Sequence, residues 1–137
     1  MKKLLKRIVG RIGILRYGIK QYGKNVYIGL HTKIVNGKNM NIESNVSIMP
    51  YNMLVCHGKG NIIIHENAEI GMFSRIAAVS KVEIGKDVIT GPNIFIADYN
   101  HKYEDIETPI KYQGNVTKGE NPSVYIGDGT WIGTNVV

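Results

Sequence analysis

An aliphatic residue recurs every six positions through most of this 137-residue chain. The positions fall into blocks: Ile28, Ile34; Ile42, Ile48, Leu54; Ile64, Ile70, Ile76; Ile84, Thr90, Ile96; Ile126, Ile132. An amphipathic helix would repeat every 3.6 residues and a half-buried strand every two. A period of six is instead typical of a parallel β-helix built from short strands. We therefore predict an all-β domain over residues 25–137 in which the aliphatic side chains fill a narrow prism.

The breaks between the blocks indicate how the coils are divided. Steps of eight, ten and eight residues separate Ile34 from Ile42, Leu54 from Ile64, and Ile76 from Ile84. Each block therefore corresponds to one coil of three strands, and each aliphatic residue is expected to stack on its equivalents in the neighbouring coils. Stability would then come from contacts between adjacent coils.

The positive charge of the chain lies at its N-terminus. Residues 1–24 carry eight Lys or Arg and no acidic residue, whereas residues 25–137 carry nine basic and eleven acidic side chains. The slightly acidic body does not favour a nucleic-acid partner. A single cysteine, Cys56, excludes an internal disulfide and favours a cytoplasmic protein.

Residues 1–24 have aliphatic residues at helical spacing with basic residues between them, which predicts an amphipathic α-helix weakened by three glycines. The segment has no cleavage site of a secretory signal and is too charged to span a bilayer. Two roles stay open for it. The helix could cover the first open end of the β-helix, or it could dock peripherally on the anionic inner face of a membrane.

Three motifs carry a resemblance to a known family. They are GPNIFIADYNH (residues 91–101), PIKYQG (109–114) and IGDGTWIGTNVV (126–137). The chain resembles the hexapeptide-repeat acyltransferases, and among them the O-acetyltransferases of sugars and surface polysaccharides. The resemblance implies a left-handed β-helix, a homotrimer with active sites between the prisms, and acetyl-CoA as the acyl donor. It also implies an acceptor hydroxyl on a sugar or on a polysaccharide or lipopolysaccharide precursor.

Residues 97–125 interrupt the repeat with a polar segment that we predict to be a long, structureless catalytic loop. By resemblance, His101 is the general base that lets the acceptor hydroxyl attack acetyl-CoA directly, without an acyl-enzyme; a neutral imidazole suits this role. Asp98 and Asn100 are both candidates to hold the imidazole, and a backbone carbonyl is a third. His101 could also be an ordinary solvated histidine.

The resemblance also implies residues that contact the two substrates. Thr134 falls where related enzymes contact the thioester oxygen, and Gly133 and Trp131 fall beside the pantetheine arm. Trp131 could instead close a corner of a coil. For the acceptor we consider Tyr99, Tyr103 and Arg75, although the tyrosines could simply seal the loop against the prism.

Two alternatives were weighed against this function. A β-helix with a three-histidine zinc site is disfavoured because no second histidine stands at residues 102–106, and His31, His57 and His65 are expected on exposed turns, so no metal is predicted. The second alternative is a non-catalytic trimer. The sequence stops at Val137, where relatives continue with further coils that line much of the coenzyme A tunnel, and Gly71 stands where some relatives have an acceptor-binding Asn.

Overall fold

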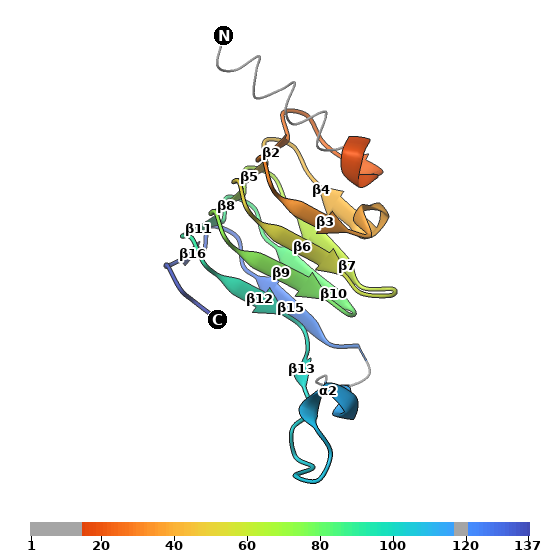
Figure 1. Cartoon of the computed structure of the whole chain (residues 1–137). Helices are drawn as coiled ribbons and strands as arrows, with labels where there is room; N and C mark the ends of the chain where they lie inside the picture. Colours follow the sequence, from red (N-terminus) through yellow and green to blue (C-terminus); the bar gives the residue numbers. More distant parts are fainter. Residues whose placement is uncertain (1–14, 117–120) are drawn as a thin grey trace.

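The computed structural model describes residues 15–116 and 121–137. The chain forms a parallel β-helix in which each of the first four coils contributes one strand to each of three sheets, and the fifth coil contributes a strand to two of them (Figure 1). The first two coils contain β1 (Gln21–Tyr22), β2 (Tyr27–Ile28), β3 (Lys33–Val35), β4 (Met40–Ile42), β5 (Ser47–Ile48) and β6 (Met53–Cys56). The following coils contain β7 (Asn61–Ile64), β8 (Glu69–Ile70), β9 (Arg75–Ala78), β10 (Lys81–Ile84), β11 (Ile89–Thr90), β12 (Phe95–Ala97), β15 (Ser123–Ile126) and β16 (Trp131–Ile132).

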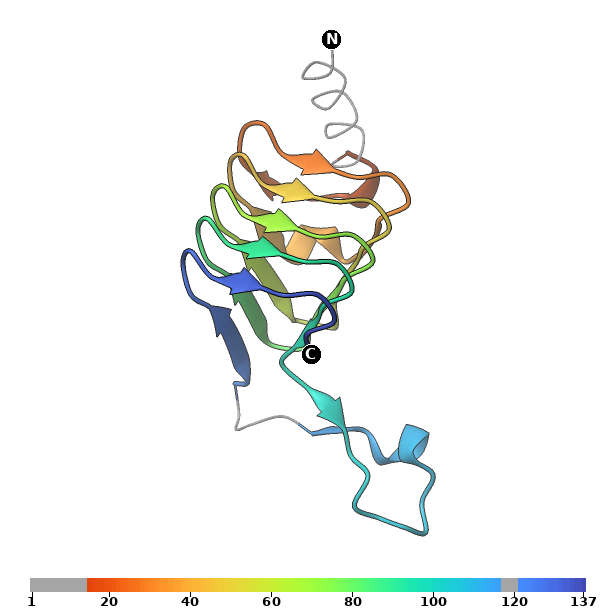
Figure 2. The ribbon, with the colours of Figure 1, turned by 90° about the vertical axis from the view of Figure 1, so that its left-hand side faces the viewer.

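Three sheets form the faces of the prism. Sheet A has the order β1-β4-β7-β10-β15, sheet B has β2-β5-β8-β11-β16 and sheet C has β3-β6-β9-β12. In Figure 2 the near strands, which belong to sheet B, run from left to right while successive coils descend from the N-terminus. This direction of winding makes the solenoid left-handed, as the resemblance implied.

The pairing register confirms the six-residue repeat as the core pattern. Ile42, Ile64 and Ile84 are partners on consecutive strands of sheet A, and Leu54 pairs with Ile76 on sheet C. All five side chains are fully buried. Burying a side chain of this size contributes roughly 2 kcal/mol, so the stacked columns are the main source of stability.

Asparagine-rich turns connect sheet A to sheet B. Asn25, Asn45, Asn67 and Asp87 have φ between 55° and 62°, a conformation that Asn and Asp adopt more readily than most residues. Their side chains form a ladder from coil to coil, with donor–acceptor distances of 3.1, 3.2 and 3.0 Å. The ladder satisfies polar side chains along this edge of the prism.

The β-helix begins earlier than the sequence predicted. Residues 15–17 are helical, but Gly18 has φ 64° and ends the helix, and β1 then pairs with β4 from Gln21 onward. The predicted helix over 1–24 is therefore wrong for its last residues, and Ile19 is buried in the prism core. The rest of that prediction, residues 1–14, lies outside the described residues.

The described residues of the loop that interrupts the repeat contain regular structure, so the prediction of a structureless loop is wrong for them. The loop contains the antiparallel pair β13 (Asn100–His101) and β14 (Asn115–Val116), with the short helix α2 (Ile110–Gln113) between them. The Gln113 amide donates to the carbonyl oxygens of Asp105 and Thr108 at 2.7 and 2.6 Å. These local bonds, absent from any period-six pattern, give the loop its shape, and it projects well away from the prism (Figure 2). The prism resumes with β15 at Ser123, two residues before the predicted end of the loop.

Candidate functional site

The loop leaves the prism at the corner between sheets C and A, and Asp98 fixes this point of departure. Its carboxylate accepts hydrogen bonds from the backbone N–H groups of Val79 at 2.8 Å and of Ser80 and Lys81 at 2.7 Å each. The residue is only 7% exposed. The carboxylate thus holds the loop base onto the turn of the preceding coil, and among the described residues it makes no hydrogen bond to His101.

Tyr99 makes a second attachment at the same corner. Its hydroxyl lies 3.1 Å from Nε2 of His57, and the two rings meet edge to face with centroids 5.5 Å apart. His57 belongs to the turn after β6, one coil further from the loop. The contact holds the Tyr99 side chain against the earlier coils of the prism. It also gives His57 a role in fastening the base of the loop, which its sequence context did not indicate.

His101 stands on β13 with an exposed side chain. Its backbone N–H donates to the side-chain oxygen of Asn100 at 2.8 Å, and its register partner on β14 is Asn115. Within residues 15–116 and 121–137, no hydrogen bond or ion pair occupies the imidazole. The imidazole ring is therefore accessible to a proton donor from outside the chain. That Asp98 or Asn100 orients the ring stays a prediction.

A groove of about 730 Å³ lies beside the base of the loop. Predicted site residues Asp98, Tyr99, Asn100 and Tyr103 line it together with the outward-facing Phe95. Arg75 lies next to this group, because its guanidinium carbon is 5.9 Å from the centre of the Phe95 ring and the two residues pair across β9 and β12. The structure thus brings most of the predicted catalytic and acceptor residues to one region.

The predicted cofactor residues lie elsewhere. Trp131 is on β16 with 75% of its side chain exposed, so it faces outward from sheet B and does not close a corner of the prism. Thr134 follows in the next turn, at the corner between sheets B and C, and Gly133 precedes it. No hydrogen bond or ring contact joins these residues to His101 among the described residues, and β16 and β13 lie apart in Figures 1 and 2.

Gly71 occupies the same corner two coils earlier, and its backbone position excludes a side chain. A Cβ atom there would lie closer to the carbonyl group of Gly91 than van der Waals contact permits. An asparagine at this position, where the resemblance implied an acceptor contact, would therefore require the coils of this chain to shift.

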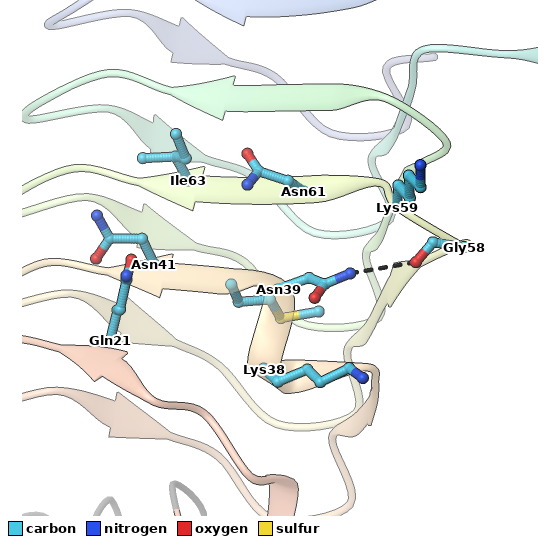
Figure 3. A pocket seen from close by; sticks show the side chains of 9 residues that line it. Gln21, Lys38, Asn39, Asn41, Gly58, Lys59, Asn61 and Ile63 are labelled. Atoms are coloured by element: carbon cyan, nitrogen blue, oxygen red, sulfur yellow. Dashed lines mark hydrogen bonds between the residues drawn. The ribbon is translucent and has the colours of Figure 1, made fainter.

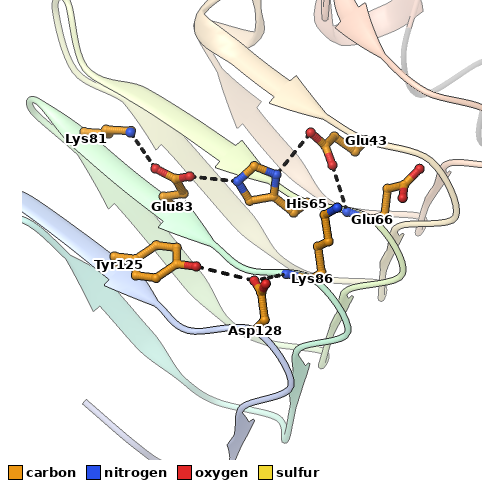
Figure 4. A network of polar contacts seen from close by, with 8 residues as sticks. All are labelled: Glu43, His65, Glu66, Lys81, Glu83, Lys86, Tyr125 and Asp128. Atoms are coloured by element: carbon orange, nitrogen blue, oxygen red, sulfur yellow. Dashed lines mark hydrogen bonds and ion pairs between the residues drawn. The ribbon is translucent and has the colours of Figure 1, made fainter.

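The other histidines are arranged differently from one another. His31 and His57 are exposed on turns, as expected, but His65 is half-buried on the outer face of sheet A. Its Nδ1 lies 3.1 Å from Glu43 and its Nε2 lies 2.7 Å from Glu83, which also pairs with Lys81 (Figure 4). The hydrogen bond to Glu83 raises the pKa of His65, and the hydrogen bond to Glu43 raises it further. Among the described residues, no three His, Cys, Asp or Glu side chains gather as a metal site.

Three comparisons place this geometry among known proteins. No family model matches the chain. The putative lipopolysaccharide biosynthesis O-acetyltransferase WbbJ of Escherichia coli is 30% identical over 82 residues, which is 58% of this chain and 42% of that protein. The probable acetyltransferase Rv3034c of Mycobacterium tuberculosis is 29% identical over 134 residues, which is 98% of this chain and 42% of that protein.

A solved structure agrees with these relatives. AntD, an N-acyltransferase from Bacillus cereus crystallised with dTDP-4-amino-4,6-dideoxyglucose and coenzyme A, superposes with a TM-score of 0.70 at 16% identity. The match covers 93% of this chain and 71% of AntD, and it shows the shared fold. The chain therefore has the β-solenoid fold of AntD and is similar in sequence to two proteins named as acetyltransferases. It spans less than half the length of either curated relative.

Several features of this hexapeptide-repeat chain could not be found from the period-six pattern. The three amides held by Asp98 come from a turn 17 to 19 residues earlier, and His57 lies 42 residues before Tyr99. Both contacts join consecutive or alternate coils at one corner. The period of six does not show which turns are neighbours. Aligning whole coils by their aliphatic columns would have placed these residues side by side.

Proposed function

We propose that this chain is an acetyltransferase unit that moves acetyl from acetyl-CoA to a sugar or to a precursor of a surface polysaccharide or lipopolysaccharide. One observation carries the proposal: His101 is exposed on β13, next in the chain to Asn100, which lines a groove together with Tyr99 and Tyr103, and the relatives of the chain are named as acetyltransferases. The exposed imidazole takes the proton from the acceptor as it attacks the thioester carbonyl. The groove holds the acceptor near the base, which supplies much of the rate acceleration.

The acceptor atom is a hydroxyl oxygen in this proposal, and a hydroxyl needs the base more than an amine does. The WbbJ relative is named as an O-acetyltransferase, whereas AntD is named as an N-acyltransferase. The two outcomes are separated by offering matched hexose and amino-hexose acceptors and measuring release of coenzyme A. If the amino sugar were turned over faster than the hexose, the proposed O-transfer would be wrong and N-transfer would take its place in the proposal.

Thr134, Gly133 and Trp131 hold the acyl donor in this proposal, with the Thr134 hydroxyl or backbone N–H at the thioester oxygen. Their separation from His101 within one chain supports a site completed by a neighbouring copy, in which the Thr134 corner of one subunit faces the His101 loop of another. A homotrimer closes such a contact three times.

A strip of exposed apolar side chains supports this assembly. His31, Tyr51 and Phe73 stack along the corner between sheets B and C, with ring centroids 5.0 and 5.1 Å apart. Tyr51 is 51% and Phe73 56% exposed, and the strip runs along the corner that also carries Thr134. On the loop, Ile106 is 92% exposed. Apolar side chains in such positions are typical of surfaces that a partner covers.

The trimer is tested with the double variant Tyr51→Ser/Phe73→Ser. Each ring stands on the surface, so we expect the coil structure to survive while the sedimentation coefficient changes from that of a trimer to that of a monomer. Lys33→Ala, an exposed substitution on sheet C, is the matched control. A parent chain that sediments as a monomer at all concentrations would contradict the assembly.

The function is tested first by calorimetric titration with acetyl-CoA, because this needs no choice of acceptor. We expect saturable binding at one site per subunit. His101→Ala should keep this binding but lose at least about a hundredfold in turnover, as removal of a general base predicts. Near-normal turnover of that variant would remove His101 from the mechanism.

The second candidate is a non-catalytic trimer, and the separation of Trp131 and Thr134 from His101 within one chain is the observation that favours it. The absence of binding in the same titration would support this candidate. For cellular location we propose the cytoplasm, with peripheral contact at the membrane through residues 1–24. Among the residues that the structure describes, no helix has the length and apolar character needed to cross a bilayer.

A further inference from the structure

A polar hollow lies on the outer face of sheet A (Figure 3). It lies over the N-terminal strands of the sheet, at the opposite end of the prism from the loop (Figure 1). Its volume is about 540 Å³, and strands β1, β4 and β7 form its floor. Four amide side chains line it: Gln21, Asn39, Asn41 and Asn61. Two lysines, Lys38 and Lys59, stand on the turns at its rim, and no carboxylate is among its lining residues.

The amides are available to a ligand. Gln21 and Asn41 are register partners on β1 and β4, and Asn61 is on the adjacent β7. Within the described residues, the side chains of these three make no hydrogen bond to the protein, whereas Asn39 donates to the carbonyl oxygens of Gly58 and Gly60 at 3.2 Å each. A primary amide offers both donors and an acceptor, so a row of amides suits a row of sugar hydroxyls.

The lysines add a requirement for negative charge. Neither Lys38 nor Lys59 forms an ion pair with any side chain of the described part of the chain, and both are exposed. Two unpaired cations beside an uncharged amide surface attract an anion to one end of the hollow. Ile63, the register partner of Asn41 on β7, supplies an apolar surface at the end of the amide row, against which the C–H face of a sugar ring can pack.

The hollow continues along sheet A. A second hollow shares Gln21 and Asn41 with it and extends to Lys86. Two carboxylates, Glu43 and Glu66, line this second hollow, so negative charge on a ligand is favoured only at the Lys38 end of the trough that the two hollows form. Two adjoining hollows suit an extended chain of sugar units better than a single small molecule.

We propose that this trough is a glycan-binding site, separate from the transfer site, that takes an oligosaccharide carrying a carboxylate or phosphate group. The link to acceptor capture rests on the proposed function, but the binding itself does not. An RNA strand is less well matched, because no aromatic side chain lines the Lys38 end for bases to stack on.

Binding is tested on the full chain by calorimetry and by ligand-observed NMR with three probes. Trigalacturonate presents carboxylates, glucose 1-phosphate presents a phosphate, and maltotriose presents hydroxyls alone. We expect an anionic probe to bind more tightly than maltotriose, with the difference shrinking as salt is raised. The tighter of the two anionic probes identifies the charged group.

Two variants assign the binding to the trough. Asn41→Ala/Asn61→Ala should weaken every probe about tenfold or more, because hydrogen bonds to both amides are lost. Lys38→Ala/Lys59→Ala should weaken the anionic probes about fivefold and leave maltotriose unchanged. Lys33→Ala, on the outer face of sheet C, should have no effect. The proposal would be overturned if all variants bound the probes with the affinity of the parent chain. It would also be overturned if no probe bound at a probe concentration of about 10 mM.

Two further measurements separate this site from the transfer site. His101→Ala should bind trigalacturonate like the parent chain, and Lys38→Ala/Lys59→Ala should bind acetyl-CoA like the parent chain. Displacement of the sugar probes by RNA or by anionic vesicles at lower concentrations would replace the glycan by that other partner. If acetyl transfer is absent while the trough variants lose glycan binding, the proposed function fails and the trough stands.

Discussion

Replacing Asp98 with Asn tests whether this carboxylate is primarily the anchor of the loop. The side chain is 7% exposed, and its two oxygens accept three N–H bonds, one on Oδ1 from Val79 and two on Oδ2 from Ser80 and Lys81. Asparagine has nearly the same shape but only one acceptor oxygen. In its best orientation it keeps the two bonds of Oδ2 and points its NH₂ group at the N–H of Val79.

The expected cost follows from this count of bonds. Leaving one buried N–H without an acceptor costs about 1–3 kcal/mol, and two bonds that become neutral lose about 1 kcal/mol each. The Asp98→Asn variant should therefore lose about 3–5 kcal/mol of unfolding free energy. This is a large part of the total stability of an ordinary domain, and for a chain of this size it lowers Tm by roughly 10–17 °C.

The assay is urea unfolding followed by circular dichroism at fixed protein concentration, since any assembly makes stability depend on concentration. Asp105→Asn is the control, because that carboxylate also accepts two N–H bonds but is fully exposed on the loop. We expect a much smaller change for the control. An Asp98→Asn variant within about 1 kcal/mol of the parent would refute the anchoring argument.

The same variant separates anchoring from catalysis. At a temperature where Asp98→Asn is folded, its turnover should fall less than that of His101→Ala, because the carboxylate already holds three amides. Equal losses in the two variants would instead support the predicted role of Asp98 in holding the imidazole.

Two further predictions concern charge. Glu83 and Glu43 raise the pKa of His65 above its ordinary value of 6.5, so their stabilising effect is fully present below pH 6.5 and is lost as the pH rises through the folded-state pKa. His65→Gln should remove this pH dependence from unfolding curves. Deleting residues 1–14 should abolish co-sedimentation with anionic vesicles while leaving β1 and the prism intact; vesicle binding that persists would refute the membrane role.

The sequence predicted the prism well because its core obeys one geometric rule. Most coils place an aliphatic side chain at the centre of each sheet, with Thr90 an exception on sheet B, so Ile48 and Ile70 pair as the period required and both are fully buried. The rule weakens at the N-terminus. There Gly18 ends the helix and the chain enters the first coil at Gln21 with no aliphatic residue at the repeat position, which Tyr22 occupies.

The corners were predicted less well because their contacts join residues one coil apart. His31, Tyr51 and Phe73 stand 20 and 22 residues apart and show no pattern in a short window. Their φ angles of 59–64° place all three side chains at the same point of successive turns. Writing the sequence with one coil per line, rather than in blocks of six residues, would have aligned these three residues and shown the strip.

The loop and the corners have different physical origins, and together they are the reason for proposing that the site is completed by a second copy. A solenoid repeats its backbone, so a residue such as Thr134 can stand only on the line of turns that its coil position allows. His101 escapes this constraint because β13 leaves the prism, but Asp98 and Tyr99 fasten the loop to the corner between sheets C and A. The two halves of the proposed site are therefore fixed on different edges of a rigid body. A rearrangement within the chain would have to break the Asp98 anchor, whereas a second copy can bring the edges together without any internal change.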